Sequence, residues 1–187
     1  MEQITPLVEI EGAFILTTEK FEDKRGSFQE CFNIKHHNSL LPEVKQVSFS
    51  RSHKNTLRGI HCSSYSKLVQ CVSGRVIDYC IDLRENSPTF KKWGSIELNG
   101  KENTVKQLFI PPRCGHAFVS LEDNSCIMYC QGGTFEPTIE IDINWKDPSL
   151  GIQWSEPLDN IPFTISIKDA NAPFLDEALK KIKLLGS

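Results

Sequence analysis

The sequence lacks the features that would mark a membrane, secreted or nucleic-acid-binding protein. No apolar run is long enough to span a membrane, and the first residues, Met1-Glu2-Gln3, do not resemble a signal peptide. The 187 residues carry a formal net charge of -3, so the basic excess that nucleic acids and membrane surfaces attract is missing. We therefore expect a cytoplasmic protein that binds neither nucleic acid nor membrane, with at most a local basic pocket.

The seven cysteines form no recognisable disulfide or zinc pattern. Their number is odd, and the spacing Cys-x-x-Cys does not occur. Cys71 and Cys80 lie inside apolar runs, where a free cysteine packs as a small hydrophobe. Cys62 and Cys114 each lie next to or near a histidine but match no standard zinc spacing, so they too are interpreted as packing residues. A reduced protein is expected.

Short apolar or alternating segments recur with turn signals about every ten residues, which is typical of an antiparallel sandwich or barrel. With 39% hydrophobic residues and no linker or repeat, residues 1–187 are expected to form one domain. We predict an all-β, cupin-like jelly-roll β-sandwich with short peripheral helices and a C-terminal helix. Strands are expected at 13–17, 44–52, 68–72, 76–83, 96–98, 105–110 and 126–130, and from His116 onward.

Three local patterns refine this picture. The segments 68–72 and 76–83 flank Ser73-Gly74, a short glycine-containing turn that predicts a β-hairpin. Residues 33–41 predict a short helix that ends near Pro42. After Pro173, apolar residues at helical spacing predict an amphipathic helix that contains Leu175, Ala178, Leu179 and Ile182.

Several polar residues indicate an anion site and a proton transfer. Arg58, His61 and Lys67 come just before or at the start of the 68–72 run. Strands that carry such cations toward an interior usually bind an anion, because an unpaired buried cation is costly. In 44–52, Gln46 and Ser48 alternate with larger residues, so small polar groups share one face, as expected of a strand that lines a cavity.

The histidines argue against a metal site of the usual cupin type. His61 and His116 are placed at the starts of two different strands, as metal-binding cupin histidines often are. However, such sites begin with a His-x-His pair and a nearby glutamate, whereas Cys62 and Ser63 follow His61. No metal is therefore expected. The other histidines lie in predicted loops or the short helix and are expected to be solvated: His36, His37 and His53.

Short motifs occur in a fixed order along most of the chain, from Phe21 to about Pro173. They are Phe21-x-Asp23-x-Arg25-Gly26-x-Phe28-x-Glu30, Leu57-Arg58-Gly59-Ile60-His61, Lys67-Leu68-Val69, Asp82-Leu83-Arg84 with Ser87-Pro88-Thr89-Phe90, Ile110-Pro111, His116, Tyr129, Trp145-x-Asp147-Pro148 and Lys168-Asp169. Each motif is weak alone, but the ordered set is highly specific. By this set the chain resembles the dTDP-4-dehydrorhamnose 3,5-epimerases of bacterial deoxysugar synthesis.

The resemblance implies a catalytic set of four residues. His61 matches the family's general base, and Asp169 matches the carboxylate that orients and charges it. Tyr129 matches the acid that donates a proton on the opposite face of the sugar, and Lys67 matches a lysine near the sugar C4 oxygen. In the family, some positions contact the sugar, the diphosphate or the nucleobase. In this sequence they are occupied by Arg25, Glu30, Gln46, Ser48, Arg58, His116, Glu140 and Lys168.

The resemblance also implies the substrate class and the assembly. The substrate is expected to be a nucleotide-diphosphate-linked 4-keto sugar, epimerised at C3, C5 or both in deoxysugar, capsule or lipopolysaccharide synthesis. No cofactor is expected, because a base, a cation at the enolate oxygen and an acid on the other face suffice. In the family, Arg25 and Glu30 reach into the neighbouring subunit's site, which implies a homodimer with exchanged segments.

The sequence departs from the family pattern around the proton-transfer residues. The segment between His61 and Lys67 is a few residues shorter, and Cys62 replaces an aromatic residue. Ser48 and Phe135 replace an asparagine and a second tyrosine. The resemblance thus implies the reaction type and leaves the substrate open. An alternative is a GDP-linked 4-keto heptose, on which relatives with a shortened loop act in capsule synthesis.

Two other classes of protein also stay open. A metal-dependent cupin oxygenase or isomerase would need bound metal, whereas a non-catalytic sugar-nucleotide-binding cupin would bind its ligand without exchanging protons. On residue type alone, Tyr129 equally fits an ordinary strand tyrosine and Asp169 a helix cap. For Arg25 and Glu30, residue type alone favours a solvated surface pair.

Overall fold

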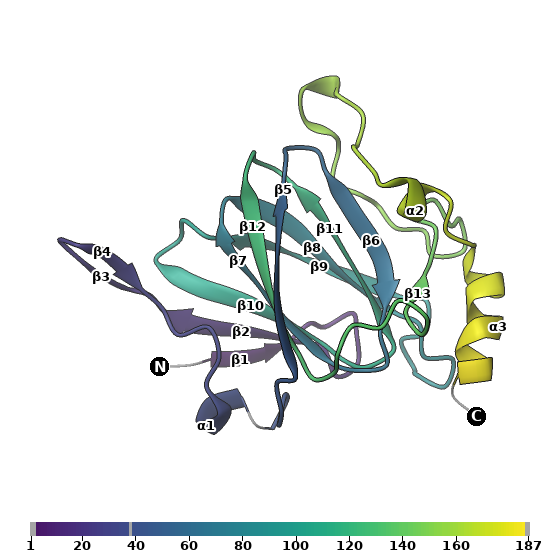
Figure 1. The fold of residues 1–187 in the computed structure, drawn as a ribbon, viewed down its shortest axis with the longest axis horizontal. Coiled ribbons are helices and arrows are strands. Elements are labelled where there is room, and N and C mark those ends of the chain that lie inside the picture. The colour runs from purple at the N-terminus through teal and green to yellow at the C-terminus, as the bar shows by residue number, and fades with distance from the viewer. Residues whose placement is uncertain (1–2, 38, 186–187) are drawn as a thin grey trace.

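In the part of the chain that the structure describes, two antiparallel sheets form a β-sandwich (Figure 1). The structure is a computed structural model, and it describes residues 3–37 and 39–185, with side chains described up to Lys181. One sheet has the order β1 (Gln3–Pro6), β2 (Phe14–Glu19), β10 (Thr104–Ile110), β7 (Lys67–Ser73), β12 (Ser125–Gln131) and β5 (Gln46–Ser52). The other has the order β13 (Ile141–Asp142), β6 (Leu57–Cys62), β11 (Cys114–Ser120), β8 (Arg75–Asp82) and β9 (Trp93–Asn99). The predicted all-β, cupin-like sandwich is confirmed.

All eight predicted strands are present, with ends that shift by three residues or fewer. Strand β6 is missing from the prediction, because Gly59 interrupts its apolar pattern and glycine is depleted in strands. Its glycine is needed for packing, since a Cβ at Gly59 would lie 2.6 Å from the Cβ of Ala117 on β11. His61 accordingly lies near the end of β6 and His116 inside β11, so neither begins a strand.

The predicted β-hairpin at Ser73-Gly74 is wrong. Strand β7 pairs with β10 and β12, whereas β8 pairs with β9 and β11, so the turn passes the chain from one sheet to the other. Gly74 has a φ of 76°, and a Cβ there would meet Ser125 Oγ at 2.6 Å. Glycine is therefore required at a corner between sheets, as it is at many hairpin turns.

The core lies between the sheets, where apolar side chains from both meet. Val69 and Ile127 of one sheet and Val76 and Phe118 of the other belong to one buried cluster. The free cysteines behave as predicted, with Cys62, Cys71, Cys80 and Cys114 buried in apolar clusters. Fully burying one such aliphatic or aromatic side chain stabilises a fold by about 1.5–3 kcal/mol.

The first helix is shorter than predicted. Helix α1 (Ile34–His37) forms a single turn within the expected range 33–41, of which residue 38 lies outside the described residues. His37 is buried rather than solvated: the Asn33 backbone N–H donates to its Nδ1 at 2.9 Å, and its ring stacks on Phe32 with centroids 5.3 Å apart. His36 and His53 are exposed, as predicted.

The C-terminal segment covers the outer face of the second sheet. Helix α3 (Leu175–Leu185) is confirmed, and Leu175, Ala178 and Leu179 join the buried cluster that contains Ile141 and Ile143. The predicted contribution of Ile182 lies outside the described side chains. Before α3 come the one-turn η1 (Leu158–Asn160) and α2 (Ile167–Ala170). None of the described helices has the length and apolar character needed to cross a membrane.

A two-stranded hairpin projects away from the sandwich. Strands β3 (Phe21–Asp23) and β4 (Gly26–Phe28) pair only with each other among the described strands, and Figure 1 shows them standing clear of both sheets. Phe21 and Phe28 are 60% and 70% exposed. An isolated hairpin is marginally stable in water at best, so this one lacks the packing that such an element ordinarily needs.

Candidate active site

A cavity of about 330 Å³ is lined by strands of both sheets. Strands β5, β7 and β12 form one wall, and β6, β11 and β13 form the other. The predicted polar face of β5 is confirmed, since Gln46, Ser48 and Ser50 line the cavity. Nine of the predicted site residues line it: His61, Tyr129, Lys67, Gln46, Ser48, Arg58, His116, Glu140 and Lys168.

His61 and Asp169 form a hydrogen-bonded pair at the edge of this cavity. Asp169 is buried on α2, whose N-cap is Ser166, and its Oδ1 lies 2.9 Å from Nε2 of His61. Burial acts to raise the pKa of Asp169, but the His61 contacts and the Gly59 N–H outweigh it and hold that pKa below its ordinary value. Because the carboxylate accepts the Nε2 proton, Nδ1 of His61 carries the free lone pair.

Tyr129 faces the same cavity from the opposite sheet. It lies on β12, and its hydroxyl is 2.8 Å from Ser50 Oγ on β5. Burial raises the pKa of Tyr129 well above its ordinary range, and the Ser50 hydrogen bond offsets only part of that shift. The ring also meets His116 edge-on, with centroids 5.9 Å apart. Tyr129 is therefore a neutral phenol at physiological pH.

Lys67 supplies a buried cation at the first position of β7. Among the described residues none forms a hydrogen bond or ion pair with its Nζ, although the residue is only 8% exposed. Burial lowers the pKa of Lys67, and the nearby Glu140 opposes that shift. A buried ammonium without a hydrogen bond is costly, so Nζ is poised to bind an oxygen atom that enters the cavity.

Glu140 is fixed by two residues of the shortened segment between His61 and Lys67. Ser63 Oγ donates to one carboxylate oxygen at 2.6 Å, and the Tyr65 hydroxyl donates to the other at 2.9 Å. The Tyr65 ring lies 5.8 Å from Lys67 Nζ. Sequence reasoning did not single out Ser63 or Tyr65 as functional, and the altered length of their loop is the signal that marks them.

The remaining polar residues of the cavity lining are held by neighbouring residues. Arg58 is held by Ser52 Oγ at 3.1 Å and by the Arg51 carbonyl at 3.2 Å. Gln46 donates to Ser48 at 2.9 Å. His116 is buried and paired with Asp78 of β8, another residue that sequence reasoning missed because the partner strand is known only from the sheet order.

Arg25 and Glu30 lie away from the cavity of their own chain. Arg25 is on the projecting hairpin and binds Asp23, with Nε 3.0 Å from Oδ2. Glu30 accepts from Asn33 at 2.9 Å and lies 3.1 Å from His36. Both side chains are exposed and form local contacts within the described chain.

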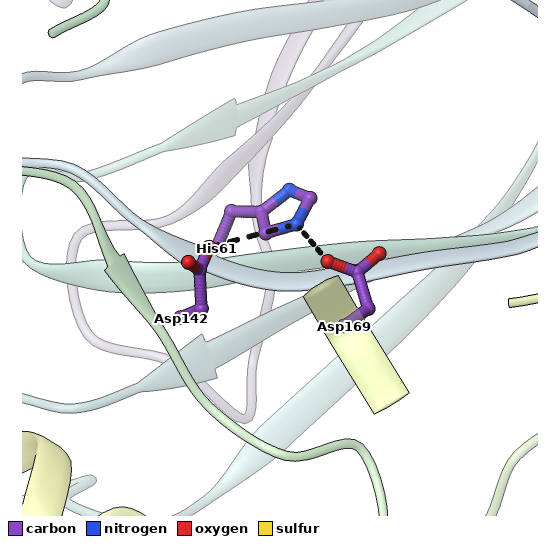
Figure 2. A group of neighbouring side chains, drawn as sticks. All are labelled: His61, Asp142 and Asp169. Atoms are coloured by element: carbon purple, nitrogen blue, oxygen red, sulfur yellow. Dashed lines mark hydrogen bonds and ion pairs between the residues drawn. The ribbon is translucent and has the colours of Figure 1, made fainter. Parts of the chain in front are cut away.

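One cluster, which includes His61, has the donor set of a cation site. His61, Asp142 and Asp169 each offer one ligand atom, and these atoms lie within 4.8 Å of one another (Figure 2). A divalent cation there would have to break the His61–Asp169 hydrogen bond and displace Lys168, whose Nζ lies 3.0 Å from Asp142 Oδ2. Asp169 Oδ1 and Asp142 Oδ2 thus already have partners within the described chain.

A cupin-type sandwich that brings a His–Asp pair, a buried cation and a protonated tyrosine to one cavity has the groups that a carbohydrate epimerase needs. The family model described as dTDP-4-dehydrorhamnose 3,5-epimerase matches residues 7–177. The chain belongs to this family, as the sequence motifs predict, and is an isomerase.

Individual relatives agree with this assignment. The dTDP-4-dehydrorhamnose 3,5-epimerase of Salmonella typhimurium is 36% identical over 177 residues, which span 91% of this chain and 94% of the relative. A 3,5-epimerase structure from Legionella pneumophila in complex with dTDP-4-keto-L-rhamnose has a TM-score of 0.85 at 34% identity and covers 94% of each chain. A 3'-monoepimerase from Streptomyces bikiniensis in complex with dTDP-quinovose has a TM-score of 0.78 at 32% identity, covering 95% of this chain and 88% of that one.

Proposed function

We propose that the protein inverts C3, C5 or both in a dTDP-linked 4-keto sugar, by deprotonation at His61 and reprotonation from Tyr129. The observation that carries this proposal is the placement of the two groups in different sheets, on opposite walls of one cavity. Inversion requires a base and an acid on opposite faces of the same carbon. A sugar ring held between the two walls meets that requirement.

The first step is removal of a proton from carbon next to the ketone. His61 Nδ1 takes the proton, and the electron pair of the broken C–H bond moves toward the C4 oxygen to give an enolate. Lys67 stabilises the negative oxygen, because its ammonium has no other hydrogen-bond partner among the described residues. Asp169 orients the ring and stabilises the imidazolium that forms.

The second step returns a proton from the other face. The enolate electron pair forms the new C–H bond with the Tyr129 proton, which leaves a phenolate beside Ser50. Because burial raises the pKa of Tyr129, the phenolate is unfavourable and regains a proton from water, while His61 loses its proton to water. Proton count and charge are thereby restored before the next turnover.

Substrate binding falls to the polar residues around this centre. Arg58 and Lys168 are cations at the cavity and suit a diphosphate, and His116 adds a further donor. Gln46, Ser48 and Glu140 suit the hydroxyl groups of the sugar and the nucleobase. The relatives' dTDP-linked ligands favour dTDP over the GDP-linked heptose alternative. We assign the enzyme to cytoplasmic deoxysugar synthesis for capsule or lipopolysaccharide.

The proposal includes a homodimer in which the β3–β4 hairpin of one copy completes the partner's cavity. Phe21 and Phe28 leave the hairpin with an unpacked apolar surface, and the edge strand β5 exposes Val47 and Phe49 on the face opposite its cavity residues. Covering the two apolar surfaces with each other stabilises both. Arg25 of one copy then lies near the other copy's substrate.

Deuterium exchange tests the function and the substrate together. The enzyme is incubated in D2O and a chelator with a dTDP-linked 4-keto-6-deoxy hexose or a GDP-linked 4-keto heptose, and NMR locates the deuterium at C3 or C5. We expect exchange with the dTDP sugar, and a loss of about 10²–10⁴-fold at every carbon in a folded His61→Asn variant. Activity that vanishes in chelator would favour a metal-dependent cupin, and binding without exchange a non-catalytic one.

A further inference from the structure

Asp142 has no role in the reaction steps above, yet it lies directly beside the base. Strand β13 pairs with β6 in a register that sets Asp142 opposite His61. Asp142 Oδ1 lies 3.8 Å from His61 Nε2, and Figure 2 shows Asp142 and Asp169 flanking the ring from two different elements. The base is thus bracketed by two carboxylates, of which one forms its hydrogen bond.

The two oxygens of Asp142 are in different environments. Oδ2 pairs with Lys168 Nζ at 3.0 Å, whereas Oδ1 is buried and has no hydrogen-bond donor among the described residues. A buried carboxylate oxygen without a donor is unfavourable unless a positive charge lies near it. Lys168 already contacts Oδ2, and the further group beside Oδ1 that can supply such a charge is the imidazole of His61 in its protonated form.

Other uses of Asp142 fit these contacts less well. Because Oδ1 is buried, a substrate hydroxyl cannot reach it without a rearrangement of the strand. A metal ion would compete with Lys168, which already binds Oδ2. The remaining use is electrostatic, through the edge of the ring that Asp169 also contacts.

We propose that Asp142 is a positioning residue that stabilises the protonated form of His61, with Lys168 on its far side limiting the effect. This inference rests on the proposed function, in which His61 must accept a proton. A carboxylate near an imidazolium favours the charged ring, and a cation bound to that carboxylate weakens the attraction. Removing Asp142 and removing Lys168 should therefore move the titration of His61 in opposite directions.

Several other charged or titratable side chains lie around His61, and they are the same in the wild type and in the Asp142 and Lys168 variants. The charged or titratable side chains that line the two cavities bordered by His61 are Asp142 from β13, Glu140 just before it, Lys168 and Asp169 from α2, Arg58 from β6, Lys67 from β7, His116 from β11, Tyr129 from β12, Arg51 from β5 and His53 just after it. A matched control is Glu136→Gln, which removes an exposed negative charge from the loop before β13. It corrects for the change in net charge.

The test is an NMR titration of histidine in the free full-length enzyme, with the His61 signal assigned by its loss in His61→Asn. In Asp142→Asn the midpoint should fall by about half a pH unit or more, and in Lys168→Met it should rise. In the double variant the rise caused by Lys168→Met should be smaller than in the single variant, because only the direct repulsion between the Lys168 ammonium and His61 is then removed. Asp142→Ser serves if the asparagine variant does not fold.

Turnover gives a second readout. In Asp142→Asn the acidic limb of the kcat/KM profile should move to lower pH, with kcat reduced about three- to tenfold and KM little changed. A midpoint in Asp142→Asn that matches that of Glu136→Gln, or a Lys168→Met effect that is undiminished without Asp142, overturns the inference. The titration needs no substrate, so its failure is distinct from failure of the proposed function, which the deuterium exchange reports.

Discussion

Asp169 accepts a hydrogen bond from Nε2 of His61 across 2.9 Å, although 108 positions separate the two residues in the sequence. The contact joins α2 to β6 and determines which ring nitrogen faces the cavity.

Asp169→Asn should therefore impair the catalytic base His61 without disrupting the fold, because an amide can donate to Nε2 and place the proton on Nδ1. We expect kcat to fall roughly 10²–10⁴-fold. Steady-state kinetics checks this, and wild-type kcat in a folded variant would contradict the orientation of His61 deduced above.

Tyr129→Phe should separate exchange from inversion. His61 can still remove a proton and return one on its own face, so deuterium should enter from D2O with retained configuration. Epimer formation should fall about 10²–10⁴-fold, the usual contribution of a general acid. NMR measures both on the same sample. Tyr79→Phe, which removes a hydroxyl bonded to the Ser155 backbone N–H, is the control and should leave the ratio unchanged. Equal loss of exchange and inversion would instead make Tyr129 a binding residue.

Lys67→Met should lower kcat roughly a hundredfold or more, because it removes the cation at the developing enolate oxygen while keeping the side-chain length. Lys106→Met is a suitable control, since Lys106 pairs with Glu102 on the surface. Steady-state kinetics distinguishes the two possible roles. A loss confined to KM would assign Lys67 to ground-state binding.

Mixed dimers test whether the projecting hairpin completes the neighbouring site. Arg25→Ala and His61→Asn are each expected to be inactive, and their mixture should recover part of the wild-type activity. A hybrid dimer contains one cavity with an intact His61 and an intact Arg25 from the other copy. Light scattering establishes the dimer, and mass spectrometry of differently labelled chains establishes exchange. A monomer, or no recovery after proven exchange, refutes the arrangement.

Asp82 should make folding stability depend on acid pH. It is fully buried on β8, and burial acts to raise its pKa, but bonds from Arg84, Ser87 and Thr89 lower that pKa to about 2. Because the folded pKa lies below the ordinary value, the stabilisation is complete above about pH 4 and is lost as the pH falls toward about 2. Asp82→Asn should cost about 2 kcal/mol of unfolding free energy at pH 7 and little near pH 2. Urea denaturation at both pH values checks this, and an equal loss at each would exclude the charge as the cause.

Local periodicity was sufficient to predict the strands and one wall of the site. The alternation of Gln46 and Ser48 with larger residues placed polar groups on one face of β5, and the cavity lies on that face. The spacing of Leu175, Ala178 and Leu179 likewise predicted helix α3. These features follow from geometry repeated every two or 3.6 residues, which a short stretch of sequence already contains. The ordered motifs added the family.

The tertiary structure decided which strands are neighbours and which charges meet. Ser73-Gly74 has the composition of a hairpin turn but connects two sheets, because sheet membership depends on pairing with distant strands. Asp142 beside His61 was invisible in the sequence for the same reason: its position follows from the register of β13 on β6. Electrostatic contacts depend on distances of a few ångströms between residues far apart in the chain, and only the packed sandwich sets those distances.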